Sequence, residues 1–243
     1  MIDYTLLREY CAPYGVALDE AACGKFDRYA QLLVEWNEKM NLTAITKPED
    51  IVLKHFADSL TALPLLPQKQ GISLIDVGTG AGFPGIPLAI ARPDIRLTLL
   101  DSLNKRLIFL QEVCHELGIA AQTVHARAEE GGRKPELRER FDVATARAVA
   151  ALPVLSEYCL PFVKKGGCFI AMKGPESDAE CHAAAKAITL LGGGAPCAHA
   201  LVLPKNLKDG VEQMERRLFV IDKVKHTPPQ YPRPSAKIAK APL

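Results

Sequence analysis

The chain has 243 residues, of which 48% are apolar and 24% are charged, and its formal net charge at pH 7 is +2. This composition is typical of a soluble globular protein, and so small a net charge does not by itself argue for a nucleic-acid partner. No run approaches the roughly 20 apolar residues that a membrane helix needs, and the amino terminus does not resemble a signal peptide. We therefore expect a cytoplasmic protein without a membrane segment.

Residues 1–70 are predicted to form a helical N-terminal extension. The stretch Thr46-Lys47-Pro48-Glu49 resembles a capping box that opens a second helix, with Pro48 in the first turn, where a missing N–H costs little. The preceding helix shows an apolar stripe at steps of three and four residues, formed by Phe26, Tyr29, Leu33, Trp36 and Met40.

The sequence pattern changes in residues 71–225, because short β-rich runs alternate there with helical stretches. This alternation predicts an α/β domain, a mostly parallel sheet with helices on both faces. Strands are expected at Ile72–Val77, Arg96–Leu100, Gln122–His125, Phe141–Thr145, Cys168–Met172 and near 198–203 and 216–224, with helices near 85–92, 104–117, 151–161 and 177–191.

Residues 226–243 are predicted to form a basic tail that is extended and orders only against a surface. No acidic residue follows Asp222, whereas several basic residues do. Such a tail either contacts phosphate or is a solvated terminal arm, and the sequence leaves both open. The candidate RNA-binding residues are Lys223, Lys225, Arg233 and Lys237.

The seven cysteines and six histidines are scattered along the chain. No two cysteines form a CxxC pair, so we expect reduced, mostly buried thiols and no structural zinc or other metal site.

The segment from Ile75 to Gly85 contains a glycine-rich loop that follows the first strand and opens a helix. Ligands of open α/β sheets bind at this carboxyl end of the strands. The loop fits the dinucleotide fingerprint G-x-G-x-x-G, and Asp101 lies 21 residues after Gly80, where an acid can bind a ribose. An oxidoreductase that uses NAD(P) is therefore one interpretation.

Asp76 favours a different cofactor. A carboxylate two residues before the first glycine would repel a pyrophosphate, but it suits S-adenosylmethionine (SAM), which carries an ammonium and a sulfonium and no phosphate. The run Asp76-Val77-Gly78-Thr79-Gly80-Ala81-Gly82 also resembles the first motif of class I SAM-dependent methyltransferases. Asp101 would accept hydrogen bonds from the ribose hydroxyls, with Ser102 capping the following helix, and Glu129 would lie beside the adenine.

Five segments occur in an order that resembles one family more specifically than the glycine loop does. The chain resembles the bacterial 16S rRNA guanine-N7 methyltransferase family, also called RsmG or GidB. The segments are Trp36–Ile45, His55–Leu60, Asp76–Leu88, Asp101–Arg106 and Thr145–Ala150.

The resemblance implies a class I Rossmann-like fold with a seven-stranded sheet, and methylation of guanine 527 (rRNA numbering) in small-subunit RNA or its assembly intermediate, with SAM as the methyl donor. The family's cofactor contacts would fall on Gly78, Phe83, Ala128, Glu129 and Arg147. The tail departs from the family pattern, because Pro234 follows Tyr231-Pro232-Arg233, and this weakens the inference of RNA contact.

The acceptor chemistry agrees with the sequence. Guanine N7 has a lone pair and no proton to lose, so its methylation needs alignment and electrostatics but no general base or nucleophile. The Asn/Asp-Pro-Pro-Tyr/Phe motif of adenine-N6 enzymes is lacking after the fourth strand, and Cys197 lies too far along the chain to be a cytosine-C5 nucleophile, so we interpret it as a core thiol.

Several assignments stay open. Arg147 follows the fourth strand and could bind the SAM carboxylate or an RNA phosphate, or form a structural ion pair with Asp142 or Glu129. Asn37, Asn41 and His55 could line the mouth of the site or hold the helical extension onto the sheet. A non-catalytic ribosome-assembly factor is the third interpretation of the chain, which we expect to be a monomer.

Overall fold

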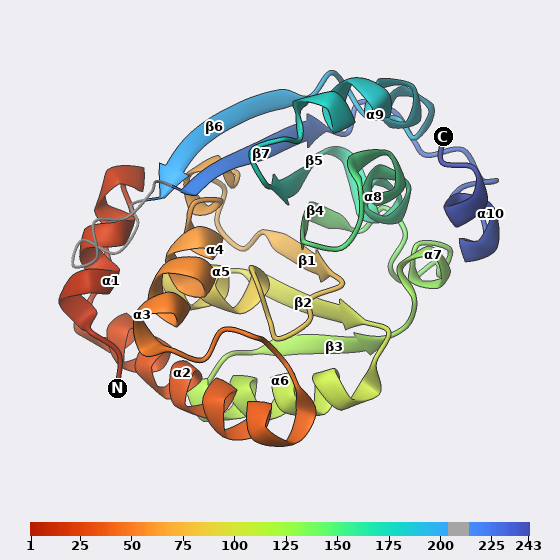
Figure 1. Cartoon of the computed structure of the whole chain (residues 1–243). Coiled ribbons are helices and arrows are strands. Elements are labelled where there is room, and N and C mark those ends of the chain that lie inside the picture. Colours follow the sequence, from red (N-terminus) through yellow and green to blue (C-terminus); the bar gives the residue numbers. More distant parts are fainter. Residues whose placement is uncertain (204–213) are drawn as a thin grey trace.

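The computed structural model describes residues 1–203 and 214–243. Its sheet has seven strands in the order β3-β2-β1-β4-β5-β7-β6, in which β1 to β5 are parallel and β7 runs antiparallel to both of its neighbours. The strands are β1 Ser73–Val77, β2 Arg96–Asp101, β3 Ala121–His125, β4 Phe141–Arg147, β5 Val163–Lys173, β6 Cys197–Leu203 and β7 Met214–Asp222 (Figure 1).

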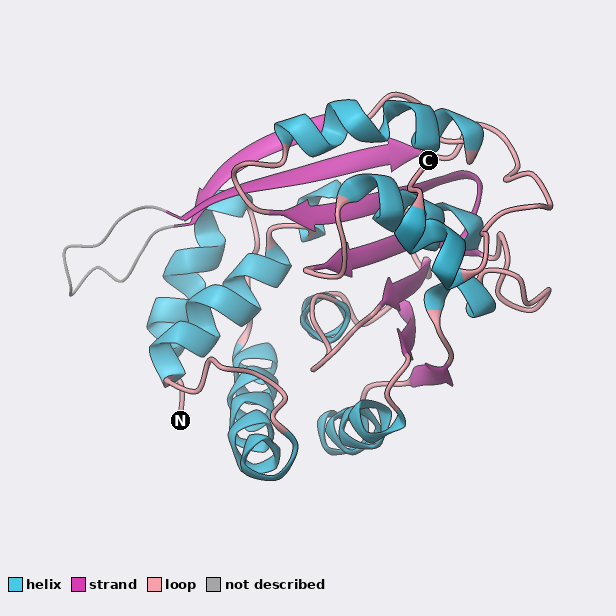
Figure 2. Ribbon diagram, turned by 45° about the vertical axis from the view of Figure 1, so that its right-hand side comes forward, coloured by secondary structure: helices cyan, strands magenta, loops and turns pink. Residues whose placement is uncertain are grey.

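Helices cover both faces of this sheet, as Figure 2 shows. On one face α5 and α6 pack on the parallel strands and α2 packs on these two helices, while α7, α8 and α9 occupy the other side. The helices are α1 Tyr4–Cys11, α2 Glu20–Met40, α3 Pro48–Ile51, α4 Asp58–Leu60, α5 Gly85–Ala91, α6 Asn104–Leu117, α7 Ala128–Gly131, α8 Leu152–Cys159, α9 Asp178–Leu190 and α10 Ser235–Lys240.

The fold agrees with the predicted α/β class and with its N-terminal helical extension. Every predicted strand is present, although β5 begins at Val163, five residues before the predicted start. Gly166 and Gly167 indicate a turn in the sequence, but Val163 pairs with Phe141, so the strand extends upstream across an irregularity in the pairing.

The extension shares one apolar core with the sheet. Leu7, Phe26 and Leu33 from the helices belong to the same buried cluster as Leu74 and Leu99 from the strands. Burial of this common surface supplies the main driving force that holds the extension against the sheet. Within the described residues, no helix has both the length and the apolar character that a bilayer crossing requires.

The predicted capping box is wrong. Lys47, not Thr46, precedes the first helical residue, and no side chain caps that end of the helix. Pro48 does occupy the first turn, where its missing N–H is tolerated. The helix then continues through a π-helical turn, Val52–Ala57, into α4. Such turns often mark functional sites, and this one carries Lys54 and His55.

The C-terminal residues are ordered against a surface, as predicted, but that surface is the domain itself, and the segment is not extended to its end because it finishes in a helix. Arg138 donates to the carbonyls of Thr227, Pro228 and Tyr231, and Arg133 donates to those of Gln230 and Pro232. The segment ends in α10, whose Ile238 is fully buried. Cys197, expected in the core, is exposed on β6, while the other cysteines are buried or half-buried and all seven are free thiols.

Candidate functional site

The glycine loop leaves the carboxyl end of β1 and brings the backbone close to its neighbours. Gly78 has a φ of +69°, and a Cβ built on it would lie 2.8 Å from Cγ2 of Val149. Both the left-handed backbone and this close approach require glycine. The loop therefore adopts the conformation that its sequence predicts.

Asp76 is fully buried beneath the loop. Its Oδ2 accepts hydrogen bonds from Thr79 Oγ1 at 2.7 Å and Gly85 N at 3.0 Å, and its Oδ1 accepts one from Thr145 Oγ1 at 3.4 Å. Burial raises the pKa of Asp76 to about 6, against the opposing effect of these hydrogen bonds. The carboxylate holds the two ends of the loop together and does not line the cavity above it.

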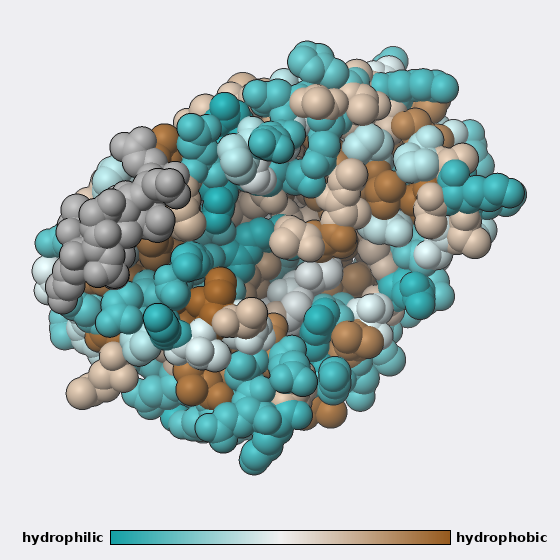
Figure 3. Space-filling view, viewed as in Figure 1, coloured by the Kyte–Doolittle hydropathy of each residue, from teal (hydrophilic) through white to brown (hydrophobic). Residues whose placement is uncertain are grey.

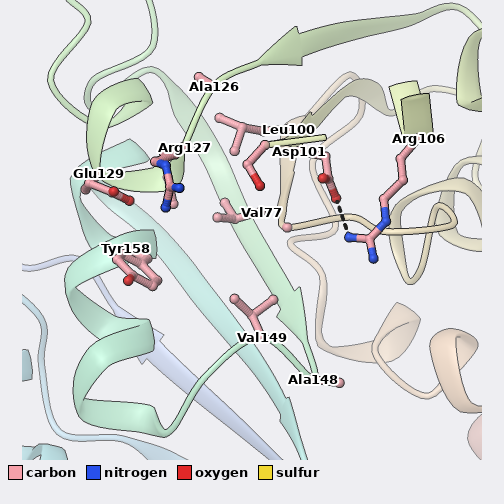
Figure 4. Close-up of a pocket in the computed structure, with 13 residues that line it drawn as sticks. Val77, Leu100, Asp101, Arg106, Ala126, Arg127, Glu129, Ala148, Val149 and Tyr158 are labelled. Carbon is pink, nitrogen blue, oxygen red and sulfur yellow. Dashed lines mark hydrogen bonds and ion pairs between the residues drawn. The ribbon is translucent and has the colours of Figure 1, made fainter. Parts of the chain in front are cut away.

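A first cavity of about 300 Å³ opens above the loop at the carboxyl edge of the sheet. Asp101 ends β2 on one side of it, where Oδ2 accepts from Gly80 N at 2.9 Å and Oδ1 accepts from Leu103 N at 2.8 Å. Arg106 lies 3.4 Å from the same carboxylate (Figure 4). The prediction that Ser102 caps α6 is wrong, because Leu103 is the capping position and Asp101 itself accepts from the backbone there.

Residues from α7 and α8 form the opposite side of the first cavity. Ala128 and Glu129 begin α7, and Tyr158 comes from α8. Figure 4 shows Glu129 and Tyr158 across the cavity from Asp101. Burial raises the pKa of Tyr158, and the charge of Glu129 adds to the effect, so the phenol is neutral at ordinary pH. The cavity therefore has a carboxylate on each side.

Phe83 lies in an aromatic stack between the glycine loop and the helical extension. The His55 ring is stacked on it with centroids 4.3 Å apart, and the Arg147 guanidinium carbon lies 5.0 Å from the centroid of the Phe83 ring. Tyr29 stacks on it with centroids 5.4 Å apart. Phe83 is nearly fully buried and does not line the first cavity.

Arg147 forms a buried ion pair, but with neither of the partners expected from the sequence. Its Nη1 donates to Asp58 Oδ2 at 2.7 Å and to the Lys54 carbonyl at 2.9 Å. The other carboxylate oxygen of Asp58 accepts from Arg216 Nε at 2.8 Å. One buried carboxylate thus fixes two arginines, one from β4 and one from β7.

His55 is held as the neutral tautomer that carries its proton on Nε2. Arg147 can only donate, so the 3.3 Å contact between its Nη2 and His55 Nδ1 requires Nδ1 to be the acceptor. The Nε2–H then donates to Thr43 Oγ1 at 2.9 Å. Burial and, to a smaller extent, the charge of the neighbouring Arg147 together lower the pKa of His55 to about 3. Asn37 bonds to the backbone of Thr43 and Asn41 ends α2 in a left-handed conformation, so both have local structural roles.

A second cavity of about 380 Å³ adjoins the first, and Ala148 lines both. Three of its basic residues were missed by the sequence analysis. Lys173 ends a parallel strand, which is a recognisable position, whereas Arg216 and Lys54 lie where no sequence pattern indicates a site. Its lining residues are Ile45, Lys54, His55, Asp58, Arg147, Ala148, Met172, Lys173, Gly174, Met214 and Arg216.

The predicted RNA-binding residues of the tail divide into two groups. Lys223 is buried, and its Nζ donates to the Leu160 carbonyl at 2.6 Å and lies 3.2 Å from Glu139 Oε1, so the prediction that it contacts RNA is wrong. Burial lowers the pKa of Lys223 to about 8. Arg233 forms an ion pair with Glu157, whereas Lys225 and Lys237 are exposed.

Comparison with known proteins now identifies the family. The model of the GidB family, described as rRNA small subunit methyltransferase G, matches residues 22–204. The chain belongs to this family. A ribosomal RNA small subunit methyltransferase G from Acetivibrio thermocellus is 51% identical over 239 residues, which cover 98% of this chain and 96% of that protein. One from Clostridium perfringens strain 13 is 47% identical over 241 residues, covering 99% and 98% respectively.

Solved structures show the same fold at low sequence identity. A precorrin-6y C5,15-methyltransferase from Geobacter metallireducens has a TM-score of 0.53 and 16% identity, covering 74% of this chain and 89% of its own. A SAM-dependent O-methyltransferase from Thermotoga maritima has a TM-score of 0.53 and 15% identity, covering 80% and 72%. The resemblance seen in the sequence and the predicted methyltransferase fold are confirmed, and membership of a methyltransferase family decides against the NAD(P) interpretation of the loop.

Proposed function

We propose that this member of the rRNA small subunit methyltransferase G family transfers a methyl group from SAM to N7 of guanine 527 (rRNA numbering) in 16S rRNA, within the small subunit or its assembly intermediate. The observation that carries the proposal is the buried carboxylate of Asp101 at the end of β2, beside a glycine loop that it holds through Gly80. That arrangement suits a ligand with ribose hydroxyls.

The first cavity offers SAM hydrogen-bonding partners on both of its sides. Asp101 would accept hydrogen bonds from the ribose hydroxyls, Gly78 would let the cofactor approach the backbone, and Ala128 and Glu129 would contact the adenine edge. The carboxylates of Asp101 and Glu129 would attract the sulfonium and the ammonium, although Arg106 and Arg127 line the same cavity and offset part of this attraction. When bound, SAM would supply the methyl group as an electrophile.

Phe83, Arg147 and Asp76 would act at the border of this site. Arg147 precedes Ala148, which lines both cavities, and its guanidinium carbon lies 5.0 Å from the centroid of the Phe83 ring; we assign the two residues to the methionine end of the cofactor. Asp76 is a positioning residue, because its carboxylate binds Thr79 and the Gly85 N–H and so fixes the loop that SAM would contact.

The proposed acceptor needs little chemistry from the protein. Guanine N7 offers a lone pair in the plane of the ring, so no proton must leave before the nitrogen attacks the methyl carbon. The residues of this chain would hold the ring in line with the methyl group and exclude water from the line of transfer. The rate should accordingly vary little with pH near neutrality, and it should survive EDTA once magnesium effects on RNA folding are separated.

The test is to incubate the protein with labelled SAM and small-subunit RNA, as naked RNA and as assembled particles, and to locate the methyl group. Mass spectrometry of nuclease-digested RNA should find it on N7 of a single guanine. A methyl group on an exocyclic amine, a ring carbon or a ribose hydroxyl would contradict the proposed acceptor, and its absence from every substrate would support a non-catalytic assembly factor.

A further inference from the structure

Four basic side chains converge on the second cavity from four different elements. Lys54 comes from the π-helical turn, Arg147 from the end of β4, Lys173 from the end of β5 and Arg216 from β7. In Figure 3, hydrophilic residues gather on this side of the molecule around a hollow near its centre. The convergence depends on the fold, because no two of these elements are adjacent in the sequence.

Among the residues that the structure describes, Asp58 is the only acidic one that lines this cavity, and both of its oxygens are occupied. It is almost fully buried, so it fixes the two arginines without presenting a carboxylate to a ligand. Arg216 uses Nε on Asp58 and Nη1 on the Glu215 carbonyl, and within the described residues its Nη2 has no bonding partner. The guanidinium is therefore oriented in advance and retains donor capacity, which suits a phosphate.

The position of the second cavity indicates whether the anion that it would bind belongs to the cofactor or to the acceptor. It meets the proposed SAM cavity at Ala148, so its ligand would lie next to the methyl group. Arg147 lines the second cavity and not the first, and it precedes Ala148 in the chain; Lys54 and Arg216 also line the second cavity alone. Their charges therefore face the acceptor.

We propose that the second cavity binds the RNA nucleotide to be methylated, and that Arg216 and Lys54 bind its backbone phosphates. This inference rests on the proposed function. Phosphate is a better partner for these cations than the base is, because methylation at N7 makes the guanine ring cationic and basic side chains against the ring would oppose that charge. Lys54 pairs with Asp50 at 2.7 Å in a partly exposed ion pair, which is weak enough to exchange for a phosphate.

Arg217 provides a matched control for Arg216. The two residues are neighbours on β7, and their side chains are 22% and 24% exposed, respectively. Arg217 points to the other face of the sheet, where it pairs with Asp178. Substitutions Arg216→Gln and Arg217→Gln thus remove the same charge from the same strand, but only the first removes it from the cavity.

The experiment measures 16S rRNA binding by the full chain at several salt concentrations, with SAM affinity by calorimetry and the melting temperature for each variant. Arg216→Gln should weaken RNA binding about 10-fold at fixed salt and reduce the slope of log K against log salt by about 0.7–0.9, as expected for one lost phosphate contact. Arg217→Gln should leave RNA binding within about twofold. SAM affinity should change less than about twofold in both variants.

Lys54→Gln provides a second test if Arg216→Gln disturbs folding, because Lys54 is partly exposed and its loss leaves the Asp58 network intact. It should reduce the salt slope in the same way, with the exposed Lys39→Gln as its control. Unchanged RNA affinity and slope in both cavity variants would overturn the proposal. Loss of SAM affinity with unchanged RNA affinity would instead assign the cavity to the cofactor carboxylate. A methyl group found on another atom would refute guanine N7 while leaving this phosphate site standing.

Discussion

Glu157 and Arg233 join the C-terminal segment to the wall of the first cavity. Arg233 donates from its backbone N at 2.7 Å, from Nε at 2.9 Å and from Nη2 at 2.7 Å to a carboxylate that is fully buried. Glu157 precedes Tyr158, which lines the cavity. The sequence suggests that Arg233 contacts RNA, whereas this geometry predicts that it supports the cofactor site.

Arg233→Ala should therefore lower stability more than an exposed arginine would. Removing one partner of a buried pair leaves an uncompensated charge and costs about 3–5 kcal/mol. Because the Arg233 side chain is 21% exposed, water can replace part of the lost interaction, and we expect about 3 kcal/mol, the lower end of that range. The exposed Lys237→Ala, in the same segment, should change stability by less than about 0.5 kcal/mol.

Urea unfolding measures this difference, and calorimetry measures SAM affinity in the same variants. Arg233→Ala should weaken SAM binding, because α8 carries Tyr158 into the cavity. The double variant Glu157→Gln/Arg233→Ala should regain part of the lost stability, since it removes the buried charge. The reasoning is refuted if Arg233→Ala leaves stability and SAM affinity unchanged but weakens RNA binding, since Arg233 would then be the RNA contact that the sequence suggests.

Three further predictions concern single residues. Asp101→Ala should weaken SAM binding by about 1–3 kcal/mol in calorimetry, and unchanged affinity in a folded variant would contradict its assignment. His55 has a pKa of about 3 when folded, below its ordinary 6.5, so the unfolded chain binds a proton that the folded chain does not. Stability should therefore fall as pH drops from about 6.5 towards 3, and His55→Gln should flatten this part of the urea-derived curve while the exposed His182→Gln does not. Lys223, with a pKa of about 8 against an ordinary 10.5, should make stability rise as pH increases between those values, and Lys223→Met should abolish the rise.

The sheet could be predicted from the sequence because its strands are short apolar runs separated by helices, a pattern that local residues determine. Helix boundaries were less predictable. Thr46 has the residue type and spacing of a capping box, but the backbone turns into the helix one residue later, so its hydroxyl does not cap it. A capping box requires a particular backbone geometry at one residue, and spacing alone does not specify it.

The candidate site could likewise be predicted from the sequence only in part. Gly78 and Asp101 were found because a strand end and a glycine loop place them at the carboxyl edge of the sheet. Arg216 was missed because its partner, Asp58, lies 158 residues upstream. The roles of Lys223 and Arg233 were missed for a similar reason, since the acids that pair with them are Glu139 and Glu157, far outside the tail.

The charged side chains that line the two cavities indicate when the proposed methyl transfer would be favoured. On the cofactor side, Asp101 and Glu129 are balanced by Arg106 and Arg127, so that cavity has two side chains of each charge. On the acceptor side, Arg216 and Lys54 would be neutralised by RNA phosphates and Arg147 pairs with Asp58, so the positive charge that develops on the guanine ring would meet fewer unpaired cations. Without RNA the second cavity is repulsive to a cationic ring, and with RNA bound it is close to neutral. Methyl transfer would thus be favoured only when the backbone is bound beside the base, and a free guanine base should be a poor acceptor even at concentrations that fill the cavity.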